Sequence, residues 1–167
     1  MSRPLTPGEA ALGRSIFGEA IDYGRVRIAR SPWRRTAFVL GSRMHFPHLP
    51  ADFALEGLGL RALFVHELAH VQQFQSSWRR TALSWLSILL SGGYGRDMRG
   101  YRYAAPLPPW AACNIEQQAS MVEHAFVLRE TGACAAAPPD ASLTDYEACV
   151  PYFSALRAGA FSRGRSS

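Results

Sequence analysis

Apolar residues recur at helical spacing in several stretches of the chain. In the segment from 58 to about 75, one stripe is formed by Leu60, Phe64, Leu68 and Val71. A first helix is predicted to begin after Thr6, because Pro7 occupies the first helical position and Glu9 completes a capping box. Further helices are expected at 81–90, at 111–129 and from a second capping box at 144–147 to about 157.

Alternating apolar and polar residues predict a small antiparallel sheet before the helix at 58–75. Val26 and Ile28 alternate with arginines, and Gly41 with Ser42 separates the runs 36–40 and 43–46 as a hairpin turn would. Segments rich in small residues and proline, at 92–110 and 132–141, are expected to be loops, the first with a short extended piece at 101–103. We therefore expect one α+β domain at 1–161 and a disordered tail at 162–167.

Composition supports a single globular domain and gives little sign of a nucleic-acid partner. Of the 167 residues, 48% are hydrophobic and 19% are charged. All 18 basic residues are arginines and the net charge is +5, but they are scattered and form no stripe, so we expect no nucleic-acid binding. The cysteines Cys113, Cys134 and Cys149 contain no CxxC pair, so neither a disulfide framework nor a cysteine zinc site is expected.

The sequence predicts neither a signal peptide nor a transmembrane span. The N-terminal residues lack the apolar core of a signal peptide, so we expect a cytoplasmic protein. The most apolar segment, 81–91, has about half of the ~20 residues needed to cross a bilayer. We expect it to form a buried helix, and the alternative is a helix that docks on a membrane or a partner.

His66, Glu67 and His70 form an HExxH motif inside the most clearly predicted helix. Two histidines four residues apart leave the same face of a helix and can bind one metal ion. Glu67 lies about 100° further round the helix, where a general base can take a proton from a metal-bound water. The motif therefore predicts a hydrolytic zinc site. The alternative is a pair of histidines flanking a solvated glutamate.

A zinc hydrolase of this type needs a third protein ligand and keeps the fourth position for water. No histidine follows at the HExxHxxGxxH spacing, so the remaining option is a glutamate from a later helix. Glu116 lies about 46 residues beyond His70, and Ala119, one turn later, leaves room for another helix to approach. Glu123 and His124, two turns beyond Glu116, could compete as ligands or support one.

Other polar residues near the motif are weaker candidates. Gln73 lies on the histidine side of the helix and could form a hydrogen bond near the site. Tyr101 and Tyr103 precede the next predicted helix, and a tyrosine hydroxyl there could stabilise an oxyanion. Packing against the fold is the alternative for both tyrosines. His45 and His48 are expected to be structural.

Three segments of the chain together resemble a known family. They are LTPGEAALGRSIFGEAIDYGRVRI at 5–28, HELAHVQQFQ at 66–75 and NIEQQASMVEHAF at 114–126. The second resembles the active-site helix of small gluzincin-like metallopeptidase domains, including a domain found among bacterial contractile-injection and toxin-associated proteins. Taken in order, the three segments are similar to short proteobacterial proteins labelled Vgr-related, after a type VI secretion spike component.

The resemblance implies a mostly helical, zincin-like fold of the minimal gluzincin kind with Zn²⁺ as cofactor. It matches His66, His70 and Glu116 to the metal ligands and Glu67 to the base. The bulky neighbours of Glu123 suit a supporting role, in which its carboxylate orients a ligand histidine.

We therefore predict a zinc-dependent endopeptidase that acts on a peptide or protein. One alternative is a non-catalytic or accessory zinc-binding module of a type VI or contractile-injection secretion system, with a spike protein as partner. Another alternative is a toxin effector of the same fold, exported by such a system.

Overall fold

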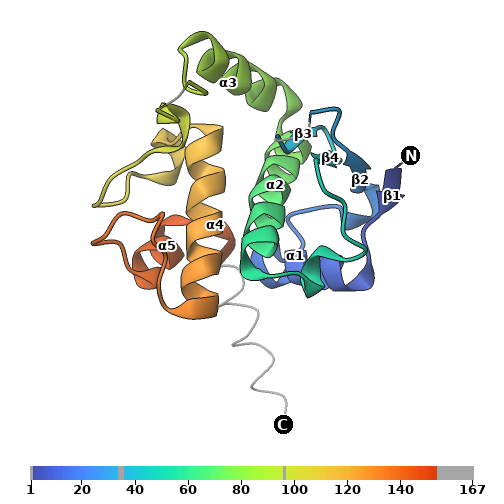
Figure 1. Ribbon diagram of the computed structural model, residues 1–167. Coiled ribbons are helices and arrows are strands. Elements are labelled where there is room, and N and C mark those ends of the chain that lie inside the picture. Colours follow the sequence, from blue (N-terminus) through green and yellow to red (C-terminus); the bar gives the residue numbers. More distant parts are fainter. Residues whose placement is uncertain (1, 34–35, 96, 154–167) are drawn as a thin grey trace.

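The computed structural model describes residues 2–33, 36–95 and 97–153. The strands are β1 (Ser2–Pro4), β2 (Arg27–Arg30), β3 (Phe38–Leu40) and β4 (Arg43–Phe46). The helices are α1 (Pro7–Phe17), α2 (Leu58–Ser76), α3 (Trp78–Leu90), α4 (Ile115–Thr131) and α5 (Leu143–Cys149). Short 3-10 helices are η1 (Tyr23–Arg25), η2 (Phe53–Leu55), η3 (Arg99–Tyr101) and η4 (Trp110–Ala112). Figure 1 shows the sheet and α1 on one side of α2, with α4 and α5 on the other. The described residues form an α+β domain, as the sequence predicts.

The first helix begins as the sequence predicts, at a capping box. The Thr6 hydroxyl accepts a hydrogen bond from the Glu9 amide at 3.0 Å, and the Glu9 carboxylate accepts one from the Thr6 amide at 2.9 Å. The Glu9 side chain is fully buried, and it also pairs with Arg3 at 2.7 Å and accepts from the Phe53 amide at 3.0 Å. One carboxylate therefore joins β1, α1 and η2.

The described strands form one sheet in the order β1-β2-β4-β3. The hairpin around Gly41 is confirmed, but β2 and β4 pair in parallel, so the prediction of a purely antiparallel sheet is wrong. The parallel pairing sets Ile28 beside Met44, and both side chains are fully buried. Alternation along a strand predicts which residues face the core, but it contains no information about the neighbouring strand.

Helices α2 and α4 lie side by side and form the centre of the domain (Figure 1). On α2, the predicted stripe is buried at Phe64, Leu68 and Val71, while Leu60 at the beginning of the helix is only partly buried. On α4, Ala119 is fully buried. A small side chain at this position lets the two helix backbones approach closely.

Three local predictions differ from the structure. Of the extended piece expected at 101–103, Tyr101 instead ends the 3-10 helix η3, and the extended backbone begins only at Arg102. Helix α5 begins one capping box earlier than expected, with Ser142 as the cap and Asp145 as its partner, because Ser142 takes the extended cap conformation. The expected continuation of the last helix to about 157 is interrupted, because α5 ends at Cys149 and Val150 has an extended backbone. The expected disordered tail at 162–167 lies outside the described residues.

The prediction that the apolar segment 81–91 forms a buried helix is wrong. Helix α3 buries only Thr81 and Ile88, and most of its large apolar side chains are exposed. The sequence pattern shows that the helix is apolar, but it does not show whether the core of the same domain packs against the apolar side chains. Among the described residues, no helix combines the length and the apolar character that crossing a membrane would need.

Candidate metal centre

Helix α2 sets two imidazoles one turn apart on the face that meets α4. His66 and His70 are both buried, with ring centroids 5.0 Å apart. The four-residue spacing places the two rings on the same side of the helix, above each other. The histidine pair of the HExxH motif therefore faces the interior of the domain and not bulk solvent.

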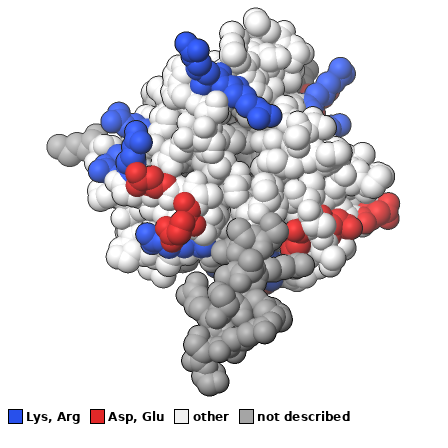
Figure 2. Space-filling view, turned by 180° about the vertical axis from the view of Figure 1, so that it is seen from behind, with Lys and Arg blue, Asp and Glu red and all other residues white. Residues whose placement is uncertain are grey.

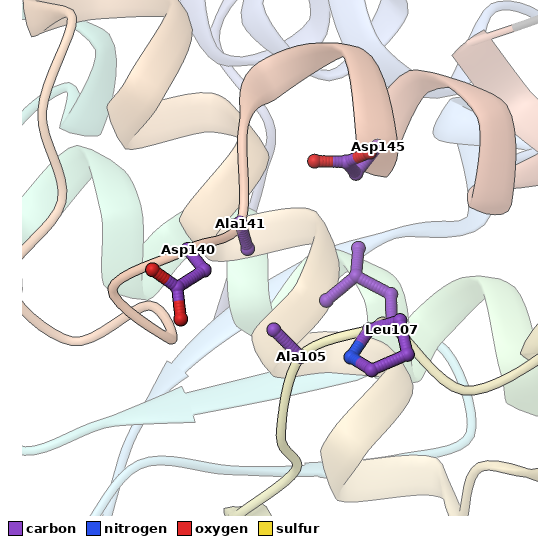
Figure 3. Close-up of a pocket in the computed structure, with 6 residues that line it drawn as sticks. Ala105, Leu107, Asp140, Ala141 and Asp145 are labelled. Atoms are coloured by element: carbon purple, nitrogen blue, oxygen red, sulfur yellow. The ribbon is translucent and has the colours of Figure 1, made fainter.

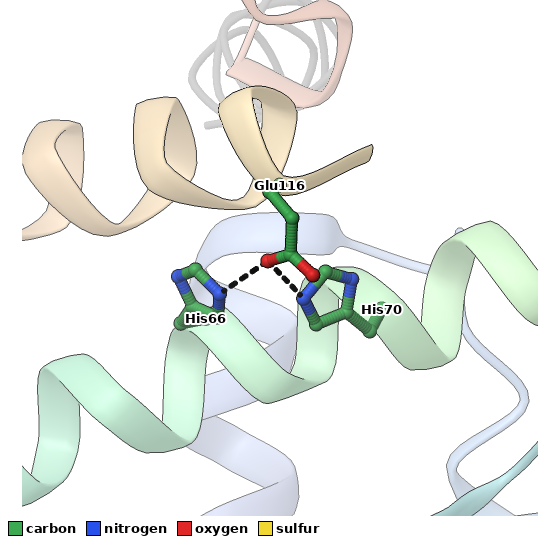
Figure 4. Close-up of side chains that lie close together, drawn as sticks. All are labelled: His66, His70 and Glu116. Carbon is green, nitrogen blue, oxygen red and sulfur yellow. Dashed lines mark hydrogen bonds and ion pairs between the residues drawn. The ribbon is translucent and has the colours of Figure 1, made fainter. Parts of the chain in front are cut away.

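The first turn of α4 supplies the third side chain of the group. Asn114 caps this helix and forms a capping box with Gln117, which fixes the direction of the first turn. Glu116 Oε2 lies 3.5 Å from His66 Nε2 and 3.2 Å from His70 Nε2. Figure 4 shows the carboxylate reaching from α4 to both rings, with dashed lines to each.

These distances fit a shared metal ion. Two donor atoms about 2.1 Å from a tetrahedral ion lie about 3.4 Å apart, which is close to both distances from Glu116. One donor atom from each of His66, His70 and Glu116 lies within 4.8 Å of the others, and all three residues are buried. The group could hold a metal ion, and its two nitrogens and one oxygen are donors that zinc accepts.

Hydrogen bonds on the far side of each ring orient both histidines. His66 Nδ1 donates to Glu123 at 2.9 Å, and His70 Nδ1 donates to the side-chain oxygen of Gln73 at 2.9 Å. The Gln73 amide donates in turn to the Ile115 carbonyl at 2.9 Å, which ties this network to the beginning of α4. Since Nδ1 of each ring is engaged on the far side, Nε2 is the nitrogen of each ring that faces Glu116.

In His66 and Glu116, the effect of charge interactions and hydrogen bonds on the pKa is larger than the effect of burial. Burial lowers the pKa of His66, but hydrogen bonds to Glu116 and Glu123 outweigh this effect and raise the pKa to about 10. Burial raises the pKa of Glu116, yet the charge of His70 and hydrogen bonds from both histidines hold that pKa well below its usual range. The carboxylate is therefore ionised, as a metal ligand must be.

Glu67 lies in a different environment from the other acidic residues of the site. Its side chain is buried, and Oε2 has no hydrogen-bond partner among the described residues. Burial raises the pKa of this carboxyl, and the charges of His70 and His66 reduce the effect. A buried carboxylate oxygen without a partner is costly, and such a group beside a metal site is a candidate proton acceptor.

Sequence reasoning did not include Tyr94, whose hydroxyl donates to Glu116 Oε1 at 2.6 Å. This bond occupies the carboxylate oxygen that does not face the histidines. Tyr94 lies in the glycine-rich loop after α3, 22 residues before Glu116. No local pattern marks it, because the contact depends on how this loop returns to α4.

The two tyrosines that the sequence singles out have different surroundings. The Tyr101 ring stacks at 6.0 Å from the His66 ring, and burial followed by the charge of Glu116 raises the pKa of its hydroxyl. The Tyr103 hydroxyl instead contacts His124 Nδ1, and it lies 2.9 Å from the Tyr146 hydroxyl. The structure therefore brings Tyr101 to the histidines and directs Tyr103 toward α5.

Two cavities lie near these elements. One, of about 300 Å³, lies beside the histidine group and is lined by Met98, Tyr101, Arg102, Tyr103, Ser120, Glu123, His124, Ala136 and Pro138. The other, of about 350 Å³, is lined by Ala105, Pro106, Leu107, Asp140, Ala141 and Asp145 (Figure 3). Of the two, only the first includes residues that contact His66, namely Tyr101 and Glu123.

The fold and the site together define an α+β domain with a buried His-His-Glu group that could hold a metal ion. No protein-family model matches the chain. The chain is 32% identical over 139 residues to the type VI secretion system spike protein VgrG2b of Pseudomonas aeruginosa. The match covers 75% of this chain and 13% of that protein.

A solved structure, the effector domain of Pseudomonas aeruginosa VgrG2b, has the same fold. The TM-score is 0.63 at 29% sequence identity, and the superposition covers 89% of this chain and 83% of that domain. The similarity in sequence and the similarity in fold both point to VgrG2b, so the chain is homologous to the VgrG2b effector domain.

Proposed function

We propose that the chain is an effector domain delivered by a type VI secretion system and that its His-His-Glu site hydrolyses peptide bonds with Zn²⁺. The homology to an effector domain supports the first part. One observation carries the second part: three buried metal-binding side chains converge beside Glu67, whose buried Oε2 has no partner among the described residues.

His66, His70 and Glu116 would hold the metal. Each histidine would bind the metal through Nε2, because its Nδ1 donates a hydrogen bond, to Glu123 from His66 and to Gln73 from His70. When bound, Zn²⁺ supplies Lewis acidity, which polarises a peptide carbonyl and makes water nucleophilic near neutral pH. The hydrogen bond from Tyr94 fixes the Glu116 carboxylate, so that the same oxygen stays directed at the two rings.

Glu67 would act as the general base. Its Oε2 accepts the proton of the attacking water and later gives it to the leaving nitrogen of the cleaved peptide bond. Burial suits the residue to this work, because it raises the pKa and so makes the carboxylate a stronger base than an exposed glutamate. Tyr101, beside His66, would donate a hydrogen bond to the developing oxyanion.

The substrate would be a peptide or protein of the cell that receives the effector. The cavity that includes Tyr101, Glu123 and His124 would accept a side chain of this substrate. A spike protein would be the delivery partner, since the related effector domain belongs to one. A domain that keeps this fold without turnover is the competing function, and it predicts metal binding without hydrolysis.

The decisive experiment combines metal analysis with protease profiling of the purified 167-residue chain and of Glu67→Gln. We expect about one zinc per chain in both proteins, and cleavage of peptide libraries by the first alone. Glu56→Gln, a change of the same kind at a partly buried acidic residue of the loop before α2, serves as the control and should cleave like the unmodified chain. Zinc without any cleavage by the unmodified chain would favour the non-catalytic module.

A further inference from the structure

Helix α3 faces solvent with its apolar side. Only Thr81 and Ile88 are buried, whereas exposed fractions reach 67% at Leu83 and 78% at Leu90. The exposed large apolar residues, which we call the α3 face, are Trp78, Leu83, Trp85, Leu86, Leu89 and Leu90. A helix that packs on its own domain buries such residues. In α3 the apolar side is instead directed toward solvent.

The α3 face is continuous. At about 100° per residue, its six side chains occupy an arc of about 160°, from Trp85 through Trp78 and Leu89 to Leu83. Ile88 lies outside this arc and anchors the helix against Gly93 and Gly100, where an added Cβ would come within 2.6 and 2.9 Å of its side chain. The helix is therefore held by one edge, and its broad apolar side is left outward.

Positive charge accompanies the α3 face. Arg79 and Arg80 are exposed in the first turn of α3. No acidic residue occurs in the sequence between Glu67 and Asp97. In the space-filling view of Figure 2, the side chains at the upper end of the molecule that carry charge are mostly basic, and the acidic side chains lie lower, with some basic side chains beside them. The end of the molecule that carries α3 therefore suits a negatively charged partner.

The dimensions of α3 do not suit a stable dimer. Thirteen residues make a helix about 20 Å long, and one side of it about 10 Å wide offers only a few hundred Å². A stable protein interface buries about 800 Å² on each partner. Tryptophan and leucine with flanking arginines are instead the composition of helices that lie in the interface of a bilayer.

We propose that the α3 face docks on the surface of an anionic lipid bilayer. The helix would lie parallel to the membrane, with Trp78, Trp85 and the leucines among the headgroups and upper acyl chains. Arg79 and Arg80 would contact lipid phosphates. This inference does not require hydrolysis, because it uses none of the residues of the metal site.

Docking would place the candidate metal centre near the membrane. His70 lies six residues before the end of α2 at Ser76, about 9 Å along the helix at 1.5 Å per residue, and α3 begins at Trp78. Tyr94, which binds Glu116, lies in the loop that follows α3. A docked α3 would therefore hold the site beside the bilayer surface, where it would meet membrane-proximal polypeptide first.

Vesicle co-sedimentation of the 167-residue chain tests this inference. We expect binding to vesicles of phosphatidylcholine mixed with phosphatidylglycerol, and at least 10-fold weaker binding to phosphatidylcholine alone. Raised salt should weaken the binding to anionic vesicles, because it screens the two arginines. The tryptophan emission should shift to shorter wavelength when anionic vesicles are added.

Matched variants identify the surface that binds. Trp85→Ser combined with Leu89→Ser should weaken binding to anionic vesicles at least 10-fold, and Arg79→Gln and Arg80→Gln about 5-fold each. Leu55→Ser, at a residue 85% exposed on η2, is the control and should bind unchanged. These side chains are exposed, so unchanged circular dichroism should accompany each variant.

Three results would overturn the inference. The first is an absence of binding to anionic vesicles by the unmodified chain. The second is binding that the Trp85 and Leu89 changes leave intact. The third is self-association without lipid that these two changes abolish, which would assign the α3 face to a second copy of the chain.

Discussion

His66 Nδ1 lies 2.9 Å from a carboxylate oxygen of Glu123, on the side of the ring opposite Glu116. The two glutamates come from one helix, two turns apart, and contact the same imidazole at its two nitrogens. Glu116 is buried, whereas the Glu123 side chain is 32% exposed. The ring between them is therefore held from both sides, and only one of its nitrogens is left for a metal.

This arrangement predicts different costs for removing the two glutamates. Glu116→Ala should weaken zinc binding more than 100-fold, because it deletes a proposed ligand. Glu123→Ala should cost about 10-fold to 100-fold, the usual effect of losing a group that orients a ligand. Equilibrium zinc titrations of both variants measure this difference. A larger loss from Glu123→Ala would mean that Glu123, and not Glu116, is the ligand.

Replacing the proposed base should separate metal binding from turnover. Glu67→Gln preserves the shape of the side chain but cannot accept a proton, so peptide hydrolysis should fall about 10²-fold to 10⁴-fold. Its zinc affinity should stay within a few-fold of the unmodified chain, because Glu67 is not among the three grouped side chains. Steady-state kinetics with a zinc titration provide both values. Hydrolysis at the unmodified rate would remove Glu67 from the mechanism.

Local sequence signals predicted those parts of the molecule that depend on neighbouring residues. The capping box of Thr6 and Glu9 and the helical spacing of His66 and His70 each lie within a few residues, and the structure contains both. The position of Glu116 opposite the histidines depends on the packing of α4, for which Ala119 gave a partial signal.

Features set by distant parts of the chain could not be predicted in this way. The parallel pairing of β2 with β4 depends on the path of the loop between them. The contact of Tyr94 with Glu116 depends on the return of the loop after α3. The outward orientation of α3 is opposite to the expected burial, because an apolar helix has the same sequence pattern whether a core or another surface covers it.

The hydrogen bond from Tyr94 should contribute to metal affinity. Tyr94→Phe keeps the ring and removes the hydroxyl that holds Glu116 Oε1, so zinc affinity should fall about 10-fold. Tyr23→Phe is the matched control, since its hydroxyl donates to the Gly18 carbonyl away from the site. Competition with a chelator of known affinity measures both variants. Equal affinities for the two variants would show that Tyr94 does not position the ligand.

Removing the metal should lower thermal stability. Bound zinc stabilises only the folded state, by about 2.7 kcal/mol when free zinc is 100 times its Kd. For a chain of this size, that corresponds to a fall in Tm of about 5 to 10 °C after chelation. The experiment compares melting with excess zinc and with a strong chelator, and Glu116→Ala is the control that should show little difference between the two. Identical melting of the unmodified chain in both conditions would contradict a zinc site.

The two sequence-predicted tyrosines should differ in their effect on catalysis. The Tyr101 ring stacks beside the His66 ring and also lines the cavity next to it, which is the position that the proposed role in catalysis requires. Tyr101→Phe should therefore lower kcat about 10²-fold, the lower end of what loss of an oxyanion donor costs. Tyr103→Phe removes a hydroxyl that contacts His124 and Tyr146, so kcat should stay within a few-fold.

Thermal melting shows whether a loss of kcat in either tyrosine variant comes from a lost catalytic contact or from a less stable fold. The hydroxyls of Tyr103 and Tyr146 lie in contact in the protein interior, so Tyr103→Phe should lower the free energy of unfolding by about 1 kcal/mol. Tyr101→Phe should leave it nearly unchanged. If Tyr103→Phe is the variant that loses kcat without losing stability, Tyr103 is the oxyanion donor and the proposed role of Tyr101 is wrong.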